Sequence, residues 1–469
     1  MAEDSLPSMT IRELAPLLRA GKLSPVELAE ATLARIEREN PRLNAYLAVF
    51  HDEALEEARE AEREIRAGRY RGPLHGIPVS LKDLFHMRGR RTTAGSKIFA
   101  EFIPAGDAAA VERLRAAGAV IVGKTNLHEL AYGITNNNPH YGPTRNPHDT
   151  ARIPGGSSGG SGAAVAAGLC AASLGTDTGG SIRIPASFCG VVGLKPAFGR
   201  VSRRGVFPLG RSLDHVGPLA RSAWDAAAVL QAIAGHDPAD QASADQPVPD
   251  FLSEIELGIQ GLVIGVPSNY FFDRLDPEVE AAVRAAIAAM ERAGALLEPV
   301  TLARFTEATE AARSILLAEA AALYEKELRD RPQDLGSDVR ALLERGRQVP
   351  ATDYAKALLE RREFQRELNG VFQKVDLIVT PAAPVTAPLI GQAEVRIQNH
   401  SEDARLASTR LVRAFNMAVV PALSLPCGRD ARGLPVGLQI IGRPFDEATV
   451  LRAAHAVDCG LRISGACNV

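Results

Sequence analysis

Two glycine-rich turns carry serine residues that could act as nucleophiles. The first spans residues 154–161 and holds Ser157 and Ser158; the second spans residues 177–183 and holds Ser181. Glycines beside a serine allow backbone conformations that a side chain would forbid, and they leave amide N–H groups free to bind an anion. The pattern is therefore typical of a site that stabilises a negatively charged intermediate.

A serine hydroxyl becomes a good nucleophile only when a base accepts its proton. None of the ten histidines lies in either turn. Lys82 follows the apolar stretch 77–81, and burial lowers the pKa of a lysine from its usual value of about 10.4. A buried, neutral Lys82 could therefore serve as the base. Neighbouring side chains of a strand face opposite sides, so Asp83 is expected to point away from the amine.

These two turns, together with the segment GIPVSLKD at residues 76–83, resemble the signature of the amidase signature family. The resemblance covers nearly the whole chain, up to the stretch GLPVGLQIIG at residues 433–442. It implies an enzyme that cleaves the C–N bond of an amide with a Ser–cis-Ser–Lys triad. The implied partner is a small-molecule amide substrate.

At the positions that match the family motif, Ser181 is the nucleophile, Ser157 is the bridging serine and Lys82 is the base. The resemblance also implies a cis peptide bond between Gly156 and Ser157, or at its neighbour. We expect Lys82 to accept the proton of Ser157 while Ser157 accepts the proton of Ser181, which attacks the carbonyl carbon. The expected oxyanion hole consists of the backbone N–H groups of Thr178, Gly179, Gly180 and Ser181.

Other residues near the motifs are expected to support this chemistry. Ser158 and Ser161 are interpreted as hydrogen-bonding scaffold, with Ser158 able to assist the proton relay. Asp177 and Arg183 flank the nucleophile, where an ion pair or backbone anchoring is favoured over direct catalysis. The loop 125–150 and the helices within 305–373 are expected to wall the substrate pocket. Contacts with the acyl part of the substrate are assigned to Ala131, Tyr132 and Gly133.

Two rival sites fit the sequence less well. Residues 156–160 also fit G-x-S-x-G, the nucleophile elbow of α/β-hydrolases, with Ser158 as the nucleophile. That motif should follow a strand, whereas residues 150–154 are short and end in proline, and the adjacent Asp214 and His215 make a poor catalytic pair. A phosphate-binding loop is disfavoured because the glycine-rich turn matches neither G-x-x-x-x-G-K-[ST] nor G-x-G-x-x-G.

Composition excludes several other classes of function. The formal net charge is −3 for 469 residues, which provides no polybasic surface for nucleic acid or an anionic membrane. Five scattered cysteines without a C-x-x-C pair favour a reducing compartment. His128, His140 and His148 lack metal-ligand spacing, so neither a metal nor a cofactor is expected.

The hydropathy pattern predicts a cytoplasmic protein. No apolar segment follows the acidic N-terminal residues, so no signal peptide is predicted. The longest apolar run, residues 163–174, is too short to cross a bilayer and is interpreted as a buried helix.

The elements that must position the site follow an α/β rhythm. Thr10 and Ser24 each begin a capping box for an N-terminal helix. A strand is predicted over residues 77–81, a helix over 107–117 and a strand over 119–122, which indicates parallel strands covered by helices. The family resemblance makes this a large mixed, mostly parallel β-sheet sandwiched by α-helices.

The whole chain, residues 1–469, is predicted to form a single amidase domain. Its parts are a helical N-terminal part of about 1–70, a signature core of about 71–235 and a C-terminal part of about 250–469. The first part could serve as a lid or an oligomer face, which leaves a homodimer open. Residues 237–249 are rich in Asp, Pro and Ala and are predicted to form a linker.

The sequence gives mixed signals about the branch of the family. One branch is the A subunit of the aminoacyl-tRNA amidotransferase, which releases ammonia from glutamine. Arg361 lies near the expected position of the arginine that binds the glutamine carboxylate. However, Ile184 replaces a glutamine, Thr409 replaces an acidic residue that would bind the α-amino group, and residues 318–324 lack an aromatic-Asp-Gly segment. These departures favour a stand-alone hydrolase of amides, including aryl amides or carbamates; the alternatives are a catalytically inactive paralogue and the A subunit.

Overall fold

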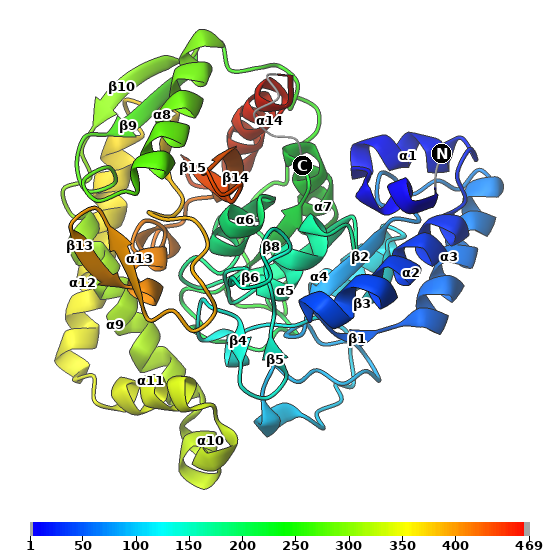
Figure 1. The fold of residues 1–469 in the computed structure, drawn as a ribbon, viewed down its shortest axis with the longest axis horizontal. Coiled ribbons are helices and arrows are strands. Elements are labelled where there is room, and N and C mark those ends of the chain that lie inside the picture. Colours follow the sequence, from blue (N-terminus) through cyan, green and yellow to red (C-terminus); the bar gives the residue numbers. More distant parts are fainter. Residues whose placement is uncertain (1–2, 464–469) are drawn as a thin grey trace.

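A mixed sheet of eleven strands runs through the molecule (Figure 1). The structure, a computed structural model, describes residues 3–463. In spatial order the strands are β1 (Tyr46–Val49), β3 (Val120–Thr125), β2 (Pro78–Lys82), β6 (Ala172–Asp177), β8 (His215–Ala220), β7 (Val192–Lys195), β14 (Ala422–Arg429), β15 (Pro435–Gly442), β11 (Leu377–Pro381), β9 (Val263–Pro267) and β10 (Leu296–Val300).

Parallel pairing is confined to two parts of this sheet. Strands β3, β2 and β6 run parallel to one another, as do β11, β9 and β10. All other neighbours in the sheet pair antiparallel. The predicted mixed α/β sheet is confirmed, but the expectation that it is mostly parallel is wrong. In the centre of the sheet, from β6 to β11, all neighbouring strands pair antiparallel with one another.

Helices cover both faces of the sheet. On one face, apolar side chains of five helices, together with Leu28 from helix α2 (Pro25–Leu43), pack with those of the strands in the largest core cluster. The five helices are α1 (Ile11–Arg19), α4 (Ala109–Ala116), α7 (Ala223–Ile233), α8 (Pro277–Arg292) and α14 (Glu447–Ile463). A second cluster buries the other face under α2, α3 (His51–Arg66), α5 (Gly159–Ala166) and α6 (Arg183–Cys189).

A further group of helices extends away from the sheet, at the lower left of Figure 1. Its longest members, α9 and α12, pack against each other, and α11 packs against α9. This group is α9 (Phe305–Leu323), α10 (Glu325–Asp330), α11 (Ser337–Arg347) and α12 (Ala351–Val371), with the short helix α13 (Ala404–Thr409) and the two-stranded sheet of β12 (Glu394–Ile397) and β13 (His400–Asp403) nearby. A small hairpin of β4 (Asn137–Asn138) and β5 (Gly142–Pro143) lies in the loop that follows β3.

Local sequence signals set several element boundaries. Both predicted capping boxes are present, with the Thr10 and Ser24 side chains accepting hydrogen bonds from backbone N–H groups of α1 and α2. The interpretation of residues 163–174 as one helix is wrong, because α5 ends at Ala166 and β6 begins at Ala172. Gly168 has a φ of +69°, which other residues rarely adopt, and it ends the helix there.

Residues 237–249 form no helix or strand but do not behave as a loose linker. The Asp237 carboxylate accepts a hydrogen bond from the Ser202 hydroxyl at 2.7 Å, and the Ala244 N–H donates to the Gly199 carbonyl at 2.9 Å. The division of the chain into three parts stays a prediction. None of the helices in residues 3–463 is long and apolar enough to cross a membrane.

Candidate active site

The parallel strands β2 and β6 end at the same edge of the sheet. They are direct neighbours, with Leu81 opposite Leu174, so Lys82 and Asp177 both lie where the strands end. In open α/β sheets this carboxyl edge is where ligands bind. The strand pair therefore brings Lys82 next to the turn that carries Ser181.

Lys82 is fully buried and bonded to two hydroxyl groups. Its Nζ lies 2.7 Å from Ser157 Oγ and 2.8 Å from Thr176 Oγ1. The next residue, Asp83, faces away as strand alternation predicts, and it forms a buried ion pair with Lys124 at 3.1 Å. The only carboxylate adjacent in sequence is thus engaged elsewhere and does not pair with the Lys82 amine.

Burial lowers the pKa of Lys82 to about 7, because the ammonium form loses its hydration inside the protein. The charges of Asp177 and Asp214 act in the opposite direction but do not overcome this effect. A substantial fraction of Lys82 is therefore neutral near pH 7, which is the form that can accept a proton.

The two glycine-rich turns are tied to each other. The peptide bond between Gly156 and Ser157 is cis. The Ser158 N–H donates to the Ser181 carbonyl oxygen at 3.2 Å, and the Ser157 carbonyl accepts from the His128 N–H at 3.1 Å. The Lys82–Ser157 pair and the Ser181 turn consequently belong to one compact unit.

The Ser158 side chain is engaged with the backbone of β6. Its hydroxyl donates to the Thr176 carbonyl at 3.2 Å and accepts from the Thr176 N–H at 3.3 Å. Asp214 accepts from the Thr178 hydroxyl at 2.6 Å, and His215 Nδ1 donates to the Leu213 carbonyl at 2.6 Å. These contacts place Ser158 in a structural role and leave it without the Asp–His pair that the nucleophile-elbow alternative requires.

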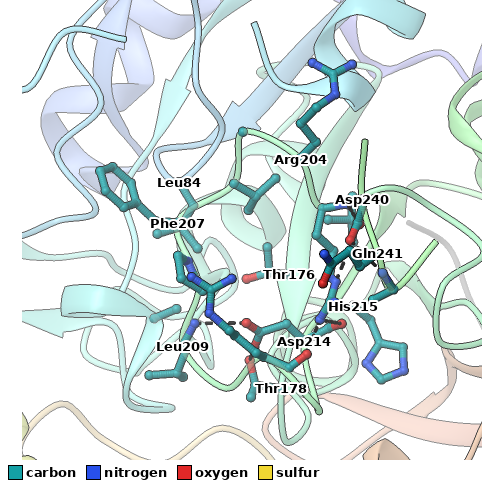
Figure 2. A pocket seen from close by; sticks show the side chains of 18 of the residues that line it. Leu84, Thr176, Thr178, Arg204, Phe207, Leu209, Asp214, His215, Asp240 and Gln241 are labelled. Carbon is teal, nitrogen blue, oxygen red and sulfur yellow. Dashed lines mark hydrogen bonds and ion pairs between the residues drawn. The ribbon is translucent and has the colours of Figure 1, made fainter. Parts of the chain in front are cut away.

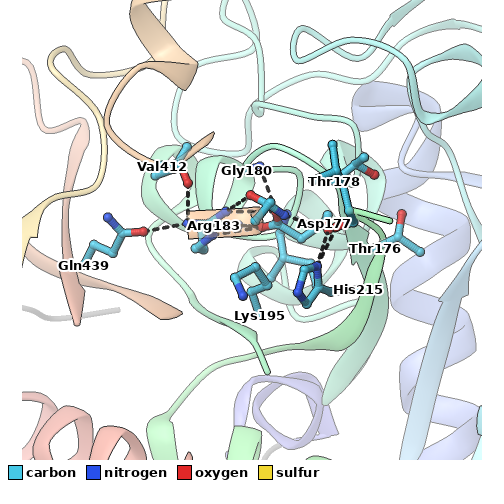
Figure 3. Close-up of polar contacts among 12 residues, drawn as sticks. Thr176, Asp177, Thr178, Gly180, Arg183, Lys195, His215, Val412 and Gln439 are labelled. Carbon is cyan, nitrogen blue, oxygen red and sulfur yellow. Dashed lines mark hydrogen bonds and ion pairs between the residues drawn. The ribbon is translucent and has the colours of Figure 1, made fainter. Parts of the chain in front are cut away.

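Asp177 and Arg183 form a fully buried ion pair, with Arg183 Nη2 3.0 Å from Asp177 Oδ1 (Figure 3). The carboxylate also accepts from the Gly180 N–H at 2.7 Å and from the Ile182 N–H at 3.1 Å. Burial would raise the pKa of Asp177, but the Arg183 guanidinium outweighs this effect and lowers it, so the carboxylate is ionised. The pair is therefore both an ion pair and an anchor for the backbone of the turn that carries Ser181.

Arg183 in turn reaches segments far away in the chain. Its Nη1 donates to the Val412 carbonyl at 2.9 Å and to Gln439 Oε1 at 2.8 Å, as Figure 3 shows. Its Nη2 donates to Asn416 Oδ1 at 2.7 Å, and the Asn416 amide donates to Asp177 Oδ1 at 2.8 Å. The turn is therefore held from outside by the segment 412–416 and by β15.

The predicted oxyanion hole needs one correction. The Gly180 N–H is already donated to Asp177, so it is not free for a substrate oxygen. Among the described residues, the N–H groups of Thr178, Gly179 and Ser181 donate to no protein acceptor. Gly180 instead shapes the turn, because its φ of +121° is a conformation that other residues rarely adopt.

Ser181 is only 5% exposed and lines a cavity of about 280 Å³. This smaller cavity is also lined by Thr178 and Gly179 and by the three residues predicted to contact the acyl group, Ala131, Tyr132 and Gly133. Residues of α9, α11 and α13 complete its wall, and α9 and α11 lie within residues 305–373. That these helices wall the substrate pocket stays a prediction.

A larger cavity of about 570 Å³ adjoins the smaller one and shares Ala131, Thr178 and Leu209 with it. Figure 2 shows Thr176, Thr178, Asp214 and His215 around it. The larger cavity is therefore lined by Thr176, one of the two hydroxyl partners of Lys82, whereas Ser181 lines the smaller cavity.

Three residues of the site were not predicted from the sequence. Thr176 bonds to Lys82, Asn416 holds Asp177, and Arg413 lines the smaller cavity. None belongs to a motif by itself. By contrast, Arg361, the expected carboxylate-binding arginine of the amidotransferase branch, donates to the Met417 carbonyl at 2.8 Å and does not line the smaller cavity.

In the part of the chain that the structure describes, no three His, Cys, Asp or Glu side chains are grouped so that they could hold a metal ion.

A family model and a similar solved structure both relate the chain to amidases. Residues 27–451 match the family model described as Amidase. The chain is 43% identical over 473 residues to the A subunit of the glutamyl-tRNA(Gln) amidotransferase of Moorella thermoacetica, covering 96% of each chain.

Two solved structures are similar over nearly the full length. One is described as a vestigial protein complex that reveals the origins of an s-triazine catabolic enzyme, with a TM-score of 0.94, 38% identity and coverage of 98% of this chain and 99% of that chain. The other is described as an amidase, with a TM-score of 0.87, 39% identity and coverage of 97% of this chain and 100% of that chain.

Proposed function

Because the chain belongs to the amidase signature family of hydrolases acting on C–N bonds, we propose that it hydrolyses an amide through an acyl-enzyme formed on Ser181. Lys82 and Ser157 relay the proton in this proposal. The observation that carries it is the contact of 2.7 Å between Lys82 Nζ and Ser157 Oγ in a fully buried environment.

The first half of the reaction transfers the proton of Ser181 to Ser157 as the proton of Ser157 moves to the neutral Lys82 amine. Ser181 Oγ attacks the amide carbon, and the carbonyl oxygen becomes an oxyanion. The free N–H groups of Thr178, Gly179 and Ser181 are the donors for that oxyanion. When the C–N bond breaks, the proton returns through Ser157 to the leaving nitrogen.

The second half releases the acid. Water attacks the ester formed on Ser181 and gives its proton to the same relay. The tetrahedral intermediate collapses, and Ser181 recovers its proton as the carboxylic acid leaves. Each proton that enters the relay thus leaves it, so no external acid or base is consumed.

Two substitutions of neighbouring serines test the assignment. Ser181→Ala should abolish amide hydrolysis, and Ser157→Ala should lower kcat by roughly 100-fold or more because the general base loses its contact with the nucleophile. Ser158→Ala is the matched control, since within residues 3–463 the Ser158 hydroxyl hydrogen-bonds only to the backbone of Thr176. Activity that survives in Ser181→Ala and disappears in Ser158→Ala would overturn the proposed roles.

The similar curated proteins favour the A subunit of the amidotransferase over the stand-alone hydrolase that the sequence analysis favoured. The relative from Moorella thermoacetica covers nearly the whole chain at 43% identity. One observation supports the stand-alone enzyme. Thr409, at the position of the expected acidic residue, lines the smaller cavity and accepts a hydrogen bond from Arg413 at 2.8 Å.

Assays of the purified chain separate these two functions. A stand-alone hydrolase should turn over a panel of simple amides, including an anilide and an aryl carbamate, when no other protein is present. An amidotransferase component should act on glutamine only, or should show no activity until the other subunits of that enzyme are added. The Ser181→Ala variant serves as the blank in both experiments.

A further inference from the structure

The smaller cavity beside Ser181 is rich in positive charge. Among the residues that line it, one is acidic, Asp403. The basic residues that line it are Arg313, Arg345, Arg405 and Arg413. A cavity with this excess is suited to an anionic ligand.

Arg413 lies directly against the nucleophile turn. A Cβ placed on Gly179 would lie 3.6 Å from both Cγ and Nε of Arg413. The guanidinium donates from Nη2 to Thr409, while its buried Nε has no hydrogen-bond partner among the described residues. Burial and the nearby charge of Arg313 lower the pKa of Arg413 to about 10. A buried donor without an acceptor is costly, and a carboxylate in the cavity would remove that cost.

Tyr132 provides a second donor without a partner. Its side chain is 5% exposed, and its buried hydroxyl makes no hydrogen bond within residues 3–463. Burial raises the pKa of this hydroxyl, and the charges of Arg413, Arg313 and Arg345 oppose that effect. The Tyr132 hydroxyl is thus neutral and able to donate, and three of the four arginines that line the cavity act on its pKa.

The local acidic groups leave this charge largely uncompensated. Asp403 accepts hydrogen bonds from the Arg405 and Leu406 N–H groups as the cap of α13 and lies 3.8 Å from Arg405 Nε. Glu310 reaches Arg313 only at 3.7 Å and is mostly exposed. Exposed pairs of this kind contribute little, so the arginines remain available to a ligand.

We propose that the smaller cavity binds a carboxylate on the acyl part of the substrate, so that the substrate is an amide of a short dicarboxylic acid. The Arg413 guanidinium and the Tyr132 hydroxyl hold the carboxylate. The proposal rests on the proposed function, because it places the scissile amide at Ser181. Since Arg413 packs against Gly179, the carboxylate lies close to the scissile carbonyl, which limits the acyl chain to a few carbons.

An ammonium group next to that carboxylate would be disfavoured in the same cavity. Four arginine side chains would repel it, and the one acidic side chain there already caps a helix. Glutamine and glutaramate, the monoamide of glutaric acid, differ only by this ammonium group. Butyramide lacks both charges. The three compounds therefore separate the contribution of the carboxylate from that of the ammonium.

We would measure kcat/KM for these three amides with the wild type, Arg413→Gln and Tyr132→Phe. The wild type should prefer glutaramate over butyramide by roughly 100-fold and over glutamine by roughly 10-fold, as expected for charge-assisted hydrogen bonds. Arg413→Gln should reduce the preference for glutaramate over butyramide by about 10-fold to 100-fold, and Tyr132→Phe by about 3-fold to 10-fold. Arg366→Gln, which removes an exposed arginine paired with Glu363 on α12, should leave the preference unchanged.

Binding to the Ser181→Ala variant provides a readout that does not depend on turnover. Titration calorimetry should detect glutaramate but not butyramide, and the added Arg413→Gln substitution should weaken glutaramate binding by at least roughly 10-fold. Equal binding of the two amides would overturn the carboxylate proposal, as would an unchanged preference in Arg413→Gln. Hydrolysis that persists in Ser181→Ala would instead overturn the proposed function, so the two failures are distinguishable.

Discussion

The rate of amide hydrolysis should depend on pH through the protonation of Lys82. The base must be neutral to accept a proton, and its pKa is lowered from 10.5 to about 7 by burial. kcat/KM should therefore rise with pH and level off above pH 7. With a pKa of about 7, the neutral fraction is roughly 0.09 at pH 6 and 0.91 at pH 8, about a ten-fold rise. An unperturbed lysine would be only about 0.3% neutral at pH 8.

Asp214 provides a directed perturbation of this profile. Its carboxylate is one of the two charges that raise the pKa of Lys82. Asp214→Asn removes that charge, so the pKa of Lys82 should fall and the rising limb should move to lower pH. Asp353→Asn, which removes an exposed carboxylate in the first turn of α12, should leave the limb in place. Asp214 also accepts a hydrogen bond from the Thr178 hydroxyl, so the substitution can change the maximal rate for another reason. The readout is therefore the pH at the midpoint of the rising part of the profile.

The measurement is kcat/KM for an amide without ionisable groups from pH 5 to pH 10, so that only the enzyme titrates. A rate that still rises about ten-fold per pH unit at pH 9 would refute the lowered pKa. A flat profile would refute Lys82 as the base. A limb that moves to higher pH in Asp214→Asn would contradict the electrostatic argument, since removal of a negative charge cannot favour the ammonium form.

Three further predictions concern stability and backbone geometry. Lys82→Met should abolish activity. The wild type gains stability as the pH rises from 7 towards 10.5, because the pKa of Lys82 is lower in the folded than in the unfolded chain. The variant lacks this gain, so in denaturant unfolding its stability relative to the wild type should fall by about 2 kcal/mol between pH 7 and pH 9. Gly180→Ala should reduce activity by roughly 100-fold or more, since its Cβ would lie 2.5 Å from Val412 Cγ2 at a φ of +121°. Gly179→Ala is the control, because a Cβ there makes only ordinary contacts at 3.6 Å, and its circular dichroism spectrum should match that of the wild type. Arg183→Met should cost about 3–5 kcal/mol in unfolding free energy by leaving a buried carboxylate unpaired; an unchanged unfolding midpoint would contradict this.

Local signals in the sequence predicted the helices and strands well because their causes are local. A capping box such as that of Thr10 needs only four consecutive residues, and the apolar stretch before Lys82 is sufficient to indicate a strand. The direction of strand pairing is not local. Strand β14 pairs antiparallel with β7, although more than two hundred residues separate them in the chain. For this reason local signals did not predict the antiparallel centre, and the mixed sheet was expected from the family resemblance alone.

The residues of the site likewise divide into those that local motifs reveal and those that only the folded chain brings together. Lys82, Ser157 and Ser181 belong to three motifs that the sequence displays directly, and the structure shows the contact between Lys82 and Ser157. Arg413 became visible only when α13 and the segment after it were placed against the turn that holds Gly179. Gly180 was misassigned as an oxyanion donor because the sequence does not show that Asp177 folds back onto its N–H.

The Asp177–Arg183 pair explains how an ionised carboxylate can lie near a base that must stay neutral. An isolated carboxylate near Lys82 would stabilise the ammonium form and raise its pKa. Here Asp177 shares its charge with Arg183 and accepts further hydrogen bonds from the backbone of the nucleophile turn. The Lys82 amine meets two neutral hydroxyls instead. The same ion pair therefore holds the turn that carries Ser181 and limits the field that would otherwise favour the ammonium form of Lys82. In the proposed mechanism, one buried network thus couples the position of the nucleophile to the strength of the base.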